Sequence, residues 1–228
     1  IRTILQEINL GKKSVVQQTG DNGILIRTEK LEREKIVKLE EEIEKNYPSA
    51  NMLRTSVVGP TIGKELRTKA FWSMLVAALA IVIYISIRFE FRFAIAALLA
   101  LSHDVLIVLG IFSLLAREIN SPFVAALLTI VGYSINDTIV IFDRIREKIK
   151  FAKKESFEEL TNQAVVETLP RSINTSITTL LPILAILILG GQTIQNFMIA
   201  LLVGMLAGTY SSIFVASPIL VEWQKRQQ

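Results

Sequence analysis

The sequence predicts an α-helical polytopic membrane protein with five spans and a small α+β ferredoxin-like ectodomain that lacks its first strand. Three observations lead to this fold class. The 228 residues are 51% hydrophobic, and their mean hydropathy of +0.46 is high for a soluble domain. Charged residues gather in residues 1–69, whereas few lie in residues 70–142. Long apolar segments recur along the remainder of the chain.

Residues 1–69 are predicted to form the water-soluble domain. Its expected elements are a helix over 1–10, strands over 14–19 and 24–28, a helix over 29–46 and a strand over 50–58. The sequence "GDNG" at 20–23 favours a hairpin, because glycine and asparagine tolerate a positive φ. One more strand ahead of residue 1 would complete the β-α-β-β-α-β order of a ferredoxin-like unit. The chain starts without methionine and partway into a helical pattern, so we expect natural sequence to precede it.

Residues 70–228 are predicted to form the membrane domain. The expected spans cover about 70–88, 93–115, 122–143, 173–190 and 195–221. A helix needs roughly 20 residues to cross the hydrocarbon core, so each segment is long enough, the fourth only just. The sequence "GMLAG" at 204–208 places two glycines four residues apart, which predicts close packing between helices.

Loop charges predict the orientation of the spans. Two arginines lie within 88–92, a series of arginines and lysines lies in an expected loop over 144–172, and the tail carries Lys225 and Arg226. The loops of the opposite side carry Arg117 as their basic residue. The positive-inside rule therefore places residues 88–92, residues 144–172 and the carboxyl terminus in the cytoplasm, and the soluble domain outside.

Composition narrows the chemistry. The chain has no cysteine, which excludes disulfides, thiolate metal sites and thiol nucleophiles. His103 is the single histidine, and it is better suited to hydrogen bonding than to metal binding, so no metal or cofactor is expected. The formal charge of +4 is modest and local to membrane-flanking loops, so nucleic acid is not an expected partner, whereas membrane lipid is.

Two acidic residues interrupt the apolar segments. Asp104 follows His103 near the middle of the second span, and Asp137 lies in the third. An ionised acid at such a place costs about 2.5–3.5 kcal/mol on insertion scales, so such residues face the protein interior and mark ion or proton pathways. At 1.5 Å per residue, Asp104 and Asp137 lie roughly 16 Å and 10 Å from the cytoplasmic ends of their helices.

Each of these acids has two interpretations. Asp137 is interpreted as a proton carrier in preference to a static hydrogen bond between helices. For Asp104 the two interpretations are evenly balanced, and both remain open. The two spans are expected to be antiparallel neighbours, so the acids would lie at similar depths if they share a face.

Arg171 stands at the expected cytoplasmic start of the fourth span, where its side chain could simply extend outward to water. A polar stripe at helical spacing follows it and favours an inward role; it consists of Asn174, Ser176, Thr178 and Thr179. The residues of the third span that could face this stripe are Ser134, Asn136 and Thr138. The two sets together predict a proton route between Arg171 and Asp137, in which the arginine favours the ionised carboxyl group.

Four motifs carry a resemblance to a known family. "VGPTIGKEL", "SHDVLIVLG", "VGYSINDTIVIFDRIRE" and "TLPRSINTSITTLLP" occur in this order and closely resemble the SecF branch of the SecD/SecF family, over nearly the whole chain. That family is similar to the RND transporter superfamily. The resemblance therefore implies an RND-like bundle of six spans, of which this chain would lack the first, together with the first ectodomain strand.

The resemblance also implies a function. Family members act with SecD and the SecYEG channel in the bacterial inner membrane, where proton-motive force completes the export of unfolded polypeptides after ATP-driven pushing. Asp137 and Arg171 match the positions that the family uses for proton transport. No enzymatic activity is implied.

Two other classes of protein compete with this interpretation. An intramembrane aspartyl protease would also place two acids on adjacent spans, but it requires Gly-x-Gly-Asp where residues 134–137 read Ser-Ile-Asn-Asp. A structural assembly subunit without its own proton pathway is the alternative that remains.

Overall fold

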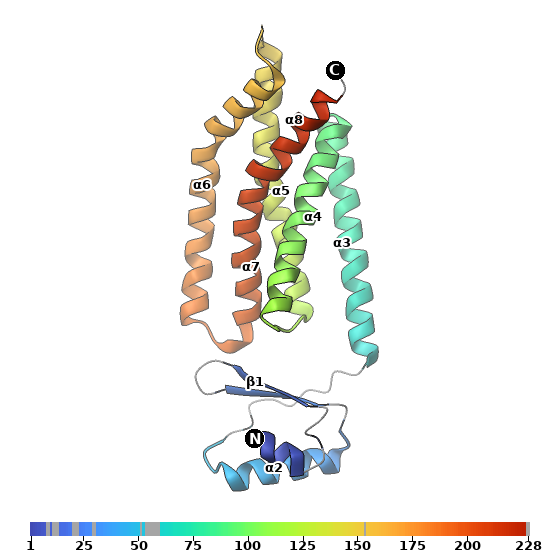
Figure 1. Ribbon diagram of the computed structural model, residues 1–228, viewed down its shortest axis with the longest axis vertical. Helices are drawn as coiled ribbons and strands as arrows, with labels where there is room; N and C mark the ends of the chain where they lie inside the picture. The colour runs from blue at the N-terminus through green and yellow to red at the C-terminus, as the bar shows by residue number, and fades with distance from the viewer. Residues whose placement is uncertain are drawn as a thin grey trace. The chain divides into compact units, whose positions relative to one another are not determined.

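The structure, a computed structural model, consists of two compact units. The residues it describes are 1–7, 10, 14–19, 23–28, 31–50, 52, 60–152 and 154–226. One unit covers Ile1–Arg67 and the other covers Thr68–Gln228. The first is a small α+β unit, and the second is a bundle of long helices (Figure 1).

The described part of the first unit combines helices with a hairpin. Its elements are α1 (Arg2–Glu7), β1 (Val15–Thr19), β2 (Gly23–Arg27) and α2 (Arg33–Asn46). The two strands pair antiparallel with Thr19 opposite Gly23, as the hairpin signal between them predicts. Ile4 and Leu5 of α1 are buried, and α1 contacts α2.

The ferredoxin-like arrangement of this unit stays a prediction. The strand expected over 50–58 falls outside the described residues, except for Ala50 and Met52. The predicted start of the helix over 29–46 is too early, because the backbone of Glu32 is extended and α2 begins at Arg33.

Within the described residues, five helices are long and apolar enough to cross a membrane, which confirms the predicted number of spans. They are α3 (Pro60–Arg88), α4 (Phe91–Leu114), α5 (Ser121–Phe151), α6 (Phe157–Leu189) and α7 (Gln192–Ser211), which continues through the π-helical turn η1 (Ser212–Ala216) into α8 (Ser217–Lys225). The chain is therefore an α-helical multi-pass membrane protein.

The prediction of a loop over 144–172 is wrong, because most of these residues are helical. α5 continues to Phe151 and α6 begins at Phe157, so only residues 152–156 connect them. Hydropathy predicts where a helix leaves the lipid, but backbone hydrogen bonds continue through polar sequence beyond that point. Both helices thus extend several turns past the apolar segments.

The start of α6 is specified by a capping box. Ser156 accepts a hydrogen bond from the backbone N–H of Glu159, and the Glu159 side chain accepts one from the backbone N–H of Ser156. Pro170 and Pro182 lie inside the helix without ending it, as neighbouring helices permit in a membrane bundle.

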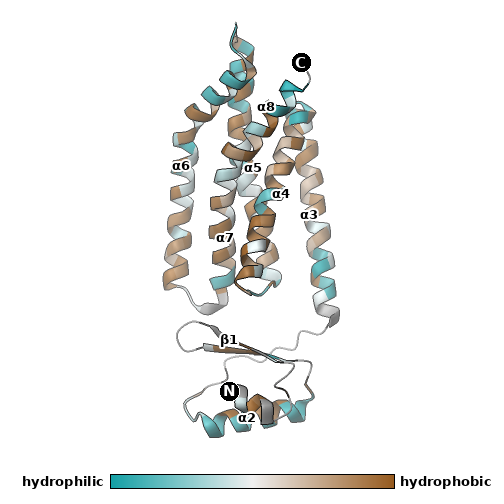
Figure 2. Ribbon diagram, in the orientation of Figure 1, coloured by the Kyte–Doolittle hydropathy of each residue, from teal (hydrophilic) through white to brown (hydrophobic). Residues whose placement is uncertain are grey.

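α5 and α7 form the centre of the bundle, and α4 and α6 pack against both. Residues 89–90, residues 154–156 and the end of α8 lie at one end (Figure 1). That end is called the basic end here, because its arginines and lysines include Arg88, Arg92, Arg144, Arg146, Lys148 and Lys150. Hydrophilic residues concentrate there, whereas the helices are mostly hydrophobic along their middle (Figure 2).

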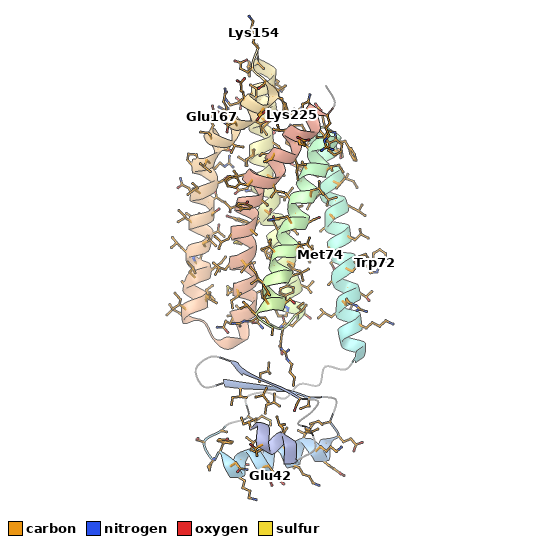
Figure 3. The ribbon with its side chains drawn as sticks, viewed as in Figure 1. Glu42, Trp72, Met74, Lys154, Glu167 and Lys225 are labelled. Atoms are coloured by element: carbon orange, nitrogen blue, oxygen red, sulfur yellow. The ribbon has the colours of Figure 1, made fainter. Side chains whose placement is uncertain are left out.

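α3 lies at the edge of the bundle. Ile85 is fully buried, and Met74, Ile81 and Val82 pack against the core. Trp72 is instead 57% exposed, and it projects from the other side of the helix than Met74 (Figure 3). One stripe of α3 thus contacts the bundle, and an apolar face is left for the membrane.

Two apolar clusters form the core of the bundle, and polar side chains lie between them. The cluster nearer the basic end includes Phe142 and Leu220, and the other includes Phe123 and Met198. The buried carboxyl group of Asp104 lies between the clusters on α4. The polar layer therefore sits at mid-bundle.

Candidate functional site

Asp104 is the centre of the polar layer, and its side chain is buried. Its Oδ2 accepts a hydrogen bond from Ser134 Oγ of α5 at 2.6 Å and another from Ser211 Oγ of α7 at 2.8 Å. His103 Nδ1 lies 3.1 Å from its Oδ1. Both oxygens are engaged, so this carboxyl group ties three helices together.

A second set of hydroxyl groups continues the layer toward the basic end. Thr138 Oγ1 of α5 and Ser212 Oγ hydrogen-bond at 2.9 Å. Ser211 and Ser212 are adjacent in sequence, yet Ser211 contacts α4 and Ser212 contacts α5. The π-helical turn η1 begins here and widens the helix locally. Such turns are rare and often occur at functional sites.

Asp137 of α5 is also buried, but its surroundings differ from those of Asp104. Its Oδ2 has no hydrogen-bond partner among the described residues, and neither has the buried Oγ of Ser172. Arg171 of α6 is the charged group that interacts electrostatically with its carboxyl group. An unsatisfied buried carboxyl oxygen is costly in a membrane bundle, so Asp137 is a functional candidate where Asp104 is a structural one.

A groove of about 530 Å³ opens between α5 and α6 at the basic end. Its lining residues are Val140, Asp143, Arg144, Glu147, Glu167, Thr168 and Arg171. Val140 and Arg144 follow Asp137 by three and seven residues, so they continue its face of α5. Arg171 both lines the groove and acts on Asp137. The groove thus begins about one turn of α5 from Asp137, whose carboxyl group does not line it.

Ion pairs join α5 to α6 at this groove. Glu167 of α6 accepts a hydrogen bond from Arg144 Nε at 2.6 Å and another from Lys148 Nζ at 2.7 Å. Arg144 also pairs with Glu147 of its own helix. Glu167 lies toward the basic end of α6 (Figure 3).

The structure brings together most of the predicted site residues, in two groups. His103, Asp104 and Ser134 form one group, and Asp137 with Arg171 forms the other. Asp104 lies at the depth of Ser134, and Asp137 follows Ser134 by three residues, about 4.5 Å along the helix. The similar depth expected for the two acids agrees with this, although Asp137 faces α6.

The predicted facing of Asn136 with Asn174 and Thr178 is wrong within this chain. All three side chains are exposed, and Thr178 Oγ1 donates to the backbone oxygen of Asn174 in its own helix. The buried face of α6 carries Ser172 and Ser176 instead. Residues two positions apart point in nearly opposite directions on a helix, so Asn174 and Thr178 must face away.

Sequence reasoning missed several groups of the site. Ser211 and Ser212 were not predicted, because they lie in an apolar span. They directly follow the segment "GMLAGTY" at 204–210, whose two glycines permit close packing. Ser172 stood next to Arg171 and was passed over. Glu167 was assigned to a loop, so its contact with α5 had no signal.

Residues 38–226 match the family described as "Protein export membrane protein SecD/SecF, C-terminal". The chain is 45% identical over 227 residues to the protein translocase subunit SecF of Rhodothermus marinus. This alignment covers 95% of this chain and 74% of that protein. The chain is also 43% identical to the protein translocase subunit SecDF of Thermus thermophilus, over all of this chain and 32% of that protein.

Solved structures agree with these sequence relatives. The crystal structure of the Thermus thermophilus SecDF, a translocon-associated membrane protein, matches with a TM-score of 0.90 and 44% identity, over 99% of this chain and 31% of that one. SecDF in its super-membrane-facing form matches with a TM-score of 0.74 and 40% identity. The chain thus spans about a third of the SecDF proteins and three quarters of that SecF.

Proposed function

The chain belongs to the SecD/SecF family of protein-export membrane proteins, and we propose that it is a proton-driven accessory subunit of the Sec translocase. Its proposed partners are SecD, the SecYEG channel and the unfolded polypeptide in transit. Association with SecD is supported by the SecDF relative, which is similar to this chain over 32% of its own length.

Asp137 is the observation that carries the proposal. It is a buried acid in a span, and one of its oxygens has no hydrogen-bond partner among the described residues. The guanidinium group of Arg171 interacts electrostatically with its carboxyl group. A carboxyl group in that position can take up a proton and lose it again, because one of its oxygens is not held by a donor. Asp104, whose oxygens are both engaged, serves as an anchor for the helices.

The proton moves from the outer side to Asp137 and leaves through the groove between α5 and α6. One elementary charge that crosses 100 mV releases about 2.3 kcal/mol, which is enough to shift a two-state bundle. Protonation removes the attraction between Asp137 and Arg171, and the helices then repack. α3 continues from the amino-terminal unit into the bundle, so it offers a covalent route for that movement.

The basic end is proposed to face the cytoplasm of a bacterium, with the bundle in the inner membrane. The positive-inside rule supports this orientation, because arginines and lysines gather at the basic end. The amino-terminal unit is then outside, where the exported polypeptide emerges. A retained grip on the polypeptide there would prevent backsliding.

The proposal is tested by export into vesicles that contain SecYEG, SecD and this chain. Export is started with ATP, the ATP is then removed, and a proton gradient is imposed. We expect partly exported polypeptide to finish crossing only when both the chain and the gradient are present. If completion is the same without a gradient, the chain acts as a structural assembly subunit and the proton-driven role is rejected.

An exposed stripe on α5 is the proposed contact surface for SecD. It consists of Ala125, Thr129, Gly132 and Asn136, which are small or polar residues left uncovered in a span. Small residues let membrane helices approach closely, and a polar side chain such as Asn136 avoids lipid when another helix covers it. The stripe adjoins Asp137, so SecD would complete the surroundings of the carrier.

Replacing Gly132 with leucine is expected to weaken the association with SecD without unfolding the chain. A side chain at Gly132 meets no atom within 4 Å in this chain, but it would separate two close-packed helices at a cost of about 1–3 kcal/mol. That corresponds to an association weaker by roughly 5- to 140-fold, measured as the SecD retained on purification. Gly110→Leu is the matched control, since Gly110 is also exposed and free of neighbours. Equal loss in both variants would reject this surface.

A further inference from the structure

The groove between α5 and α6 contains an arginine without a fixed counter-ion. Arg171 is exposed and forms no ion pair with any residue in the described part of the chain. Arg144, in the same groove, is bound by both Glu147 and Glu167. Arg171 is therefore the guanidinium group of the groove that is free to change its partner.

Two carboxyl groups flank Arg171. Asp137 lies on its buried side. Glu167 precedes it by four residues on α6, and both residues line the groove, so they share one face of the helix. Glu167 now binds Arg144 and Lys148 of α5, so it also clamps α6 to α5.

We propose that Glu167 is the exchange partner of Arg171, a positioning residue that receives the guanidinium group whenever Asp137 is protonated. This inference rests on the proposed role of Asp137 as the proton carrier. When Asp137 is ionised, Arg171 turns inward to it. When Asp137 takes up a proton, the attraction ends, and Glu167 draws Arg171 outward to the mouth of the groove.

The exchange couples the proton to a movement of helices. Glu167 has one carboxylate for three cations, namely Arg144, Lys148 and the arriving Arg171. Sharing it weakens the clamp between α5 and α6, because the two described ion pairs that join these helices depend on the same two oxygens. Protonation of Asp137 would thus loosen the basic end of the two helices, and its deprotonation would close it.

The other charged groups near the groove are already engaged. Asp143 of α5 pairs with Arg88 of α3 at 3.2 Å, and Glu147 pairs with Arg144. From α8, Lys225 pairs with Glu158, which lies nine residues before Glu167 on α6. Among the described acids, Glu167 alone shares both the groove and the helix face of Arg171.

The test is the pH profile of proton-driven export by the full complex with SecD and SecYEG in vesicles. A potassium diffusion potential holds the driving force constant while the pH is varied equally on both sides. In Glu167→Gln, Arg171 stays beside Asp137 and hinders proton uptake, so we expect the alkaline limb of the profile to move to lower pH by about one unit. Glu167→Asp should give a smaller shift, because it keeps the charge on a shorter side chain.

Glu158→Gln is the matched control, since it removes the same charge from the same helix, α6, but outside the groove, where Glu158 pairs with Lys225. We expect its alkaline limb to coincide with that of the unmodified chain. An unshifted profile in Glu167→Gln, or equal shifts in the two variants, would overturn the exchange while the carrier role of Asp137 stands. Full proton-driven export by Asp137→Asn would instead reject the carrier, and the exchange with it.

Discussion

Replacing Asp137 with asparagine is expected to reduce proton-driven export to the level measured without a gradient, while ATP-driven export continues. Asparagine has nearly the same size as aspartate and also hydrogen-bonds, so the buried site stays filled. It cannot bind and release a proton, and the cycle stops in the state that resembles the neutral acid. The measurement is export by vesicles that contain the complete complex, with ATP and with an imposed gradient in turn.

The physical reason for so large an effect is that the described part of the bundle offers no substitute for Asp137. His103 and Asp104 belong to the hydrogen-bonded group between α4, α5 and α7, and the Asp104 oxygens are taken by donors. Among the described residues of the bundle, Asp137 combines a carboxyl oxygen without a partner with an electrostatic interaction with Arg171, which lines the groove. Removing its titration therefore removes the step that the gradient drives.

Two further variants separate this effect from general damage. Glu158→Gln removes an acid at the basic end that lies outside the groove and pairs with Lys225 at the surface, and proton-driven export should persist. Asp104→Asn should lower the yield of folded protein, because the serine hydroxyls that donate to its carboxylate lose part of their acceptor. A wild-type export rate in Asp137→Asn under a full gradient would leave this residue with a static role.

The spans could be predicted from the sequence because hydropathy over about 20 residues is a strong signal in lipid. Their full lengths could not, since the charged turns of α5 and α6 beyond the apolar segments are held by contacts such as Lys148 with Glu167. Those contacts join residues 19 positions apart, and no local pattern announces them. The ion pairs at the groove therefore emerged only from the structure.

The candidate site could be predicted where a residue is energetically costly to place in a membrane. An acid such as Asp137 is expensive in a membrane, so its presence points to a function whatever the details of packing. Serine and threonine carry little such cost, because each can bond to its own helix, as Thr178 does. Which hydroxyl groups face inward depends on the rotation of each helix, and the sequence alone left Asn136 and Asn174 on the wrong side.

Replacing Gly204 with leucine is expected to disrupt the centre of the bundle. A Cβ atom at Gly204 of α7 would lie within van der Waals radii of three Ile130 side-chain atoms of α5, the nearest being Cδ1. Ile130 is fully buried, so its side chain has no free space to move into. The two helices must separate, and overpacking of this kind costs about 1–3 kcal/mol or more.

The separation should spread to the polar layer, because Gly208 packs one turn further along against Ser134, which donates to Asp104. Thermal unfolding of the purified protein in detergent measures the loss. Gly110→Leu is the control in open space. Ile130→Ala removes the atoms that the new side chain meets, so the double variant should regain part of the stability lost in Gly204→Leu. If Gly204→Leu unfolds at the same temperature as the unmodified chain, the close approach of α5 and α7 does not hold the bundle together.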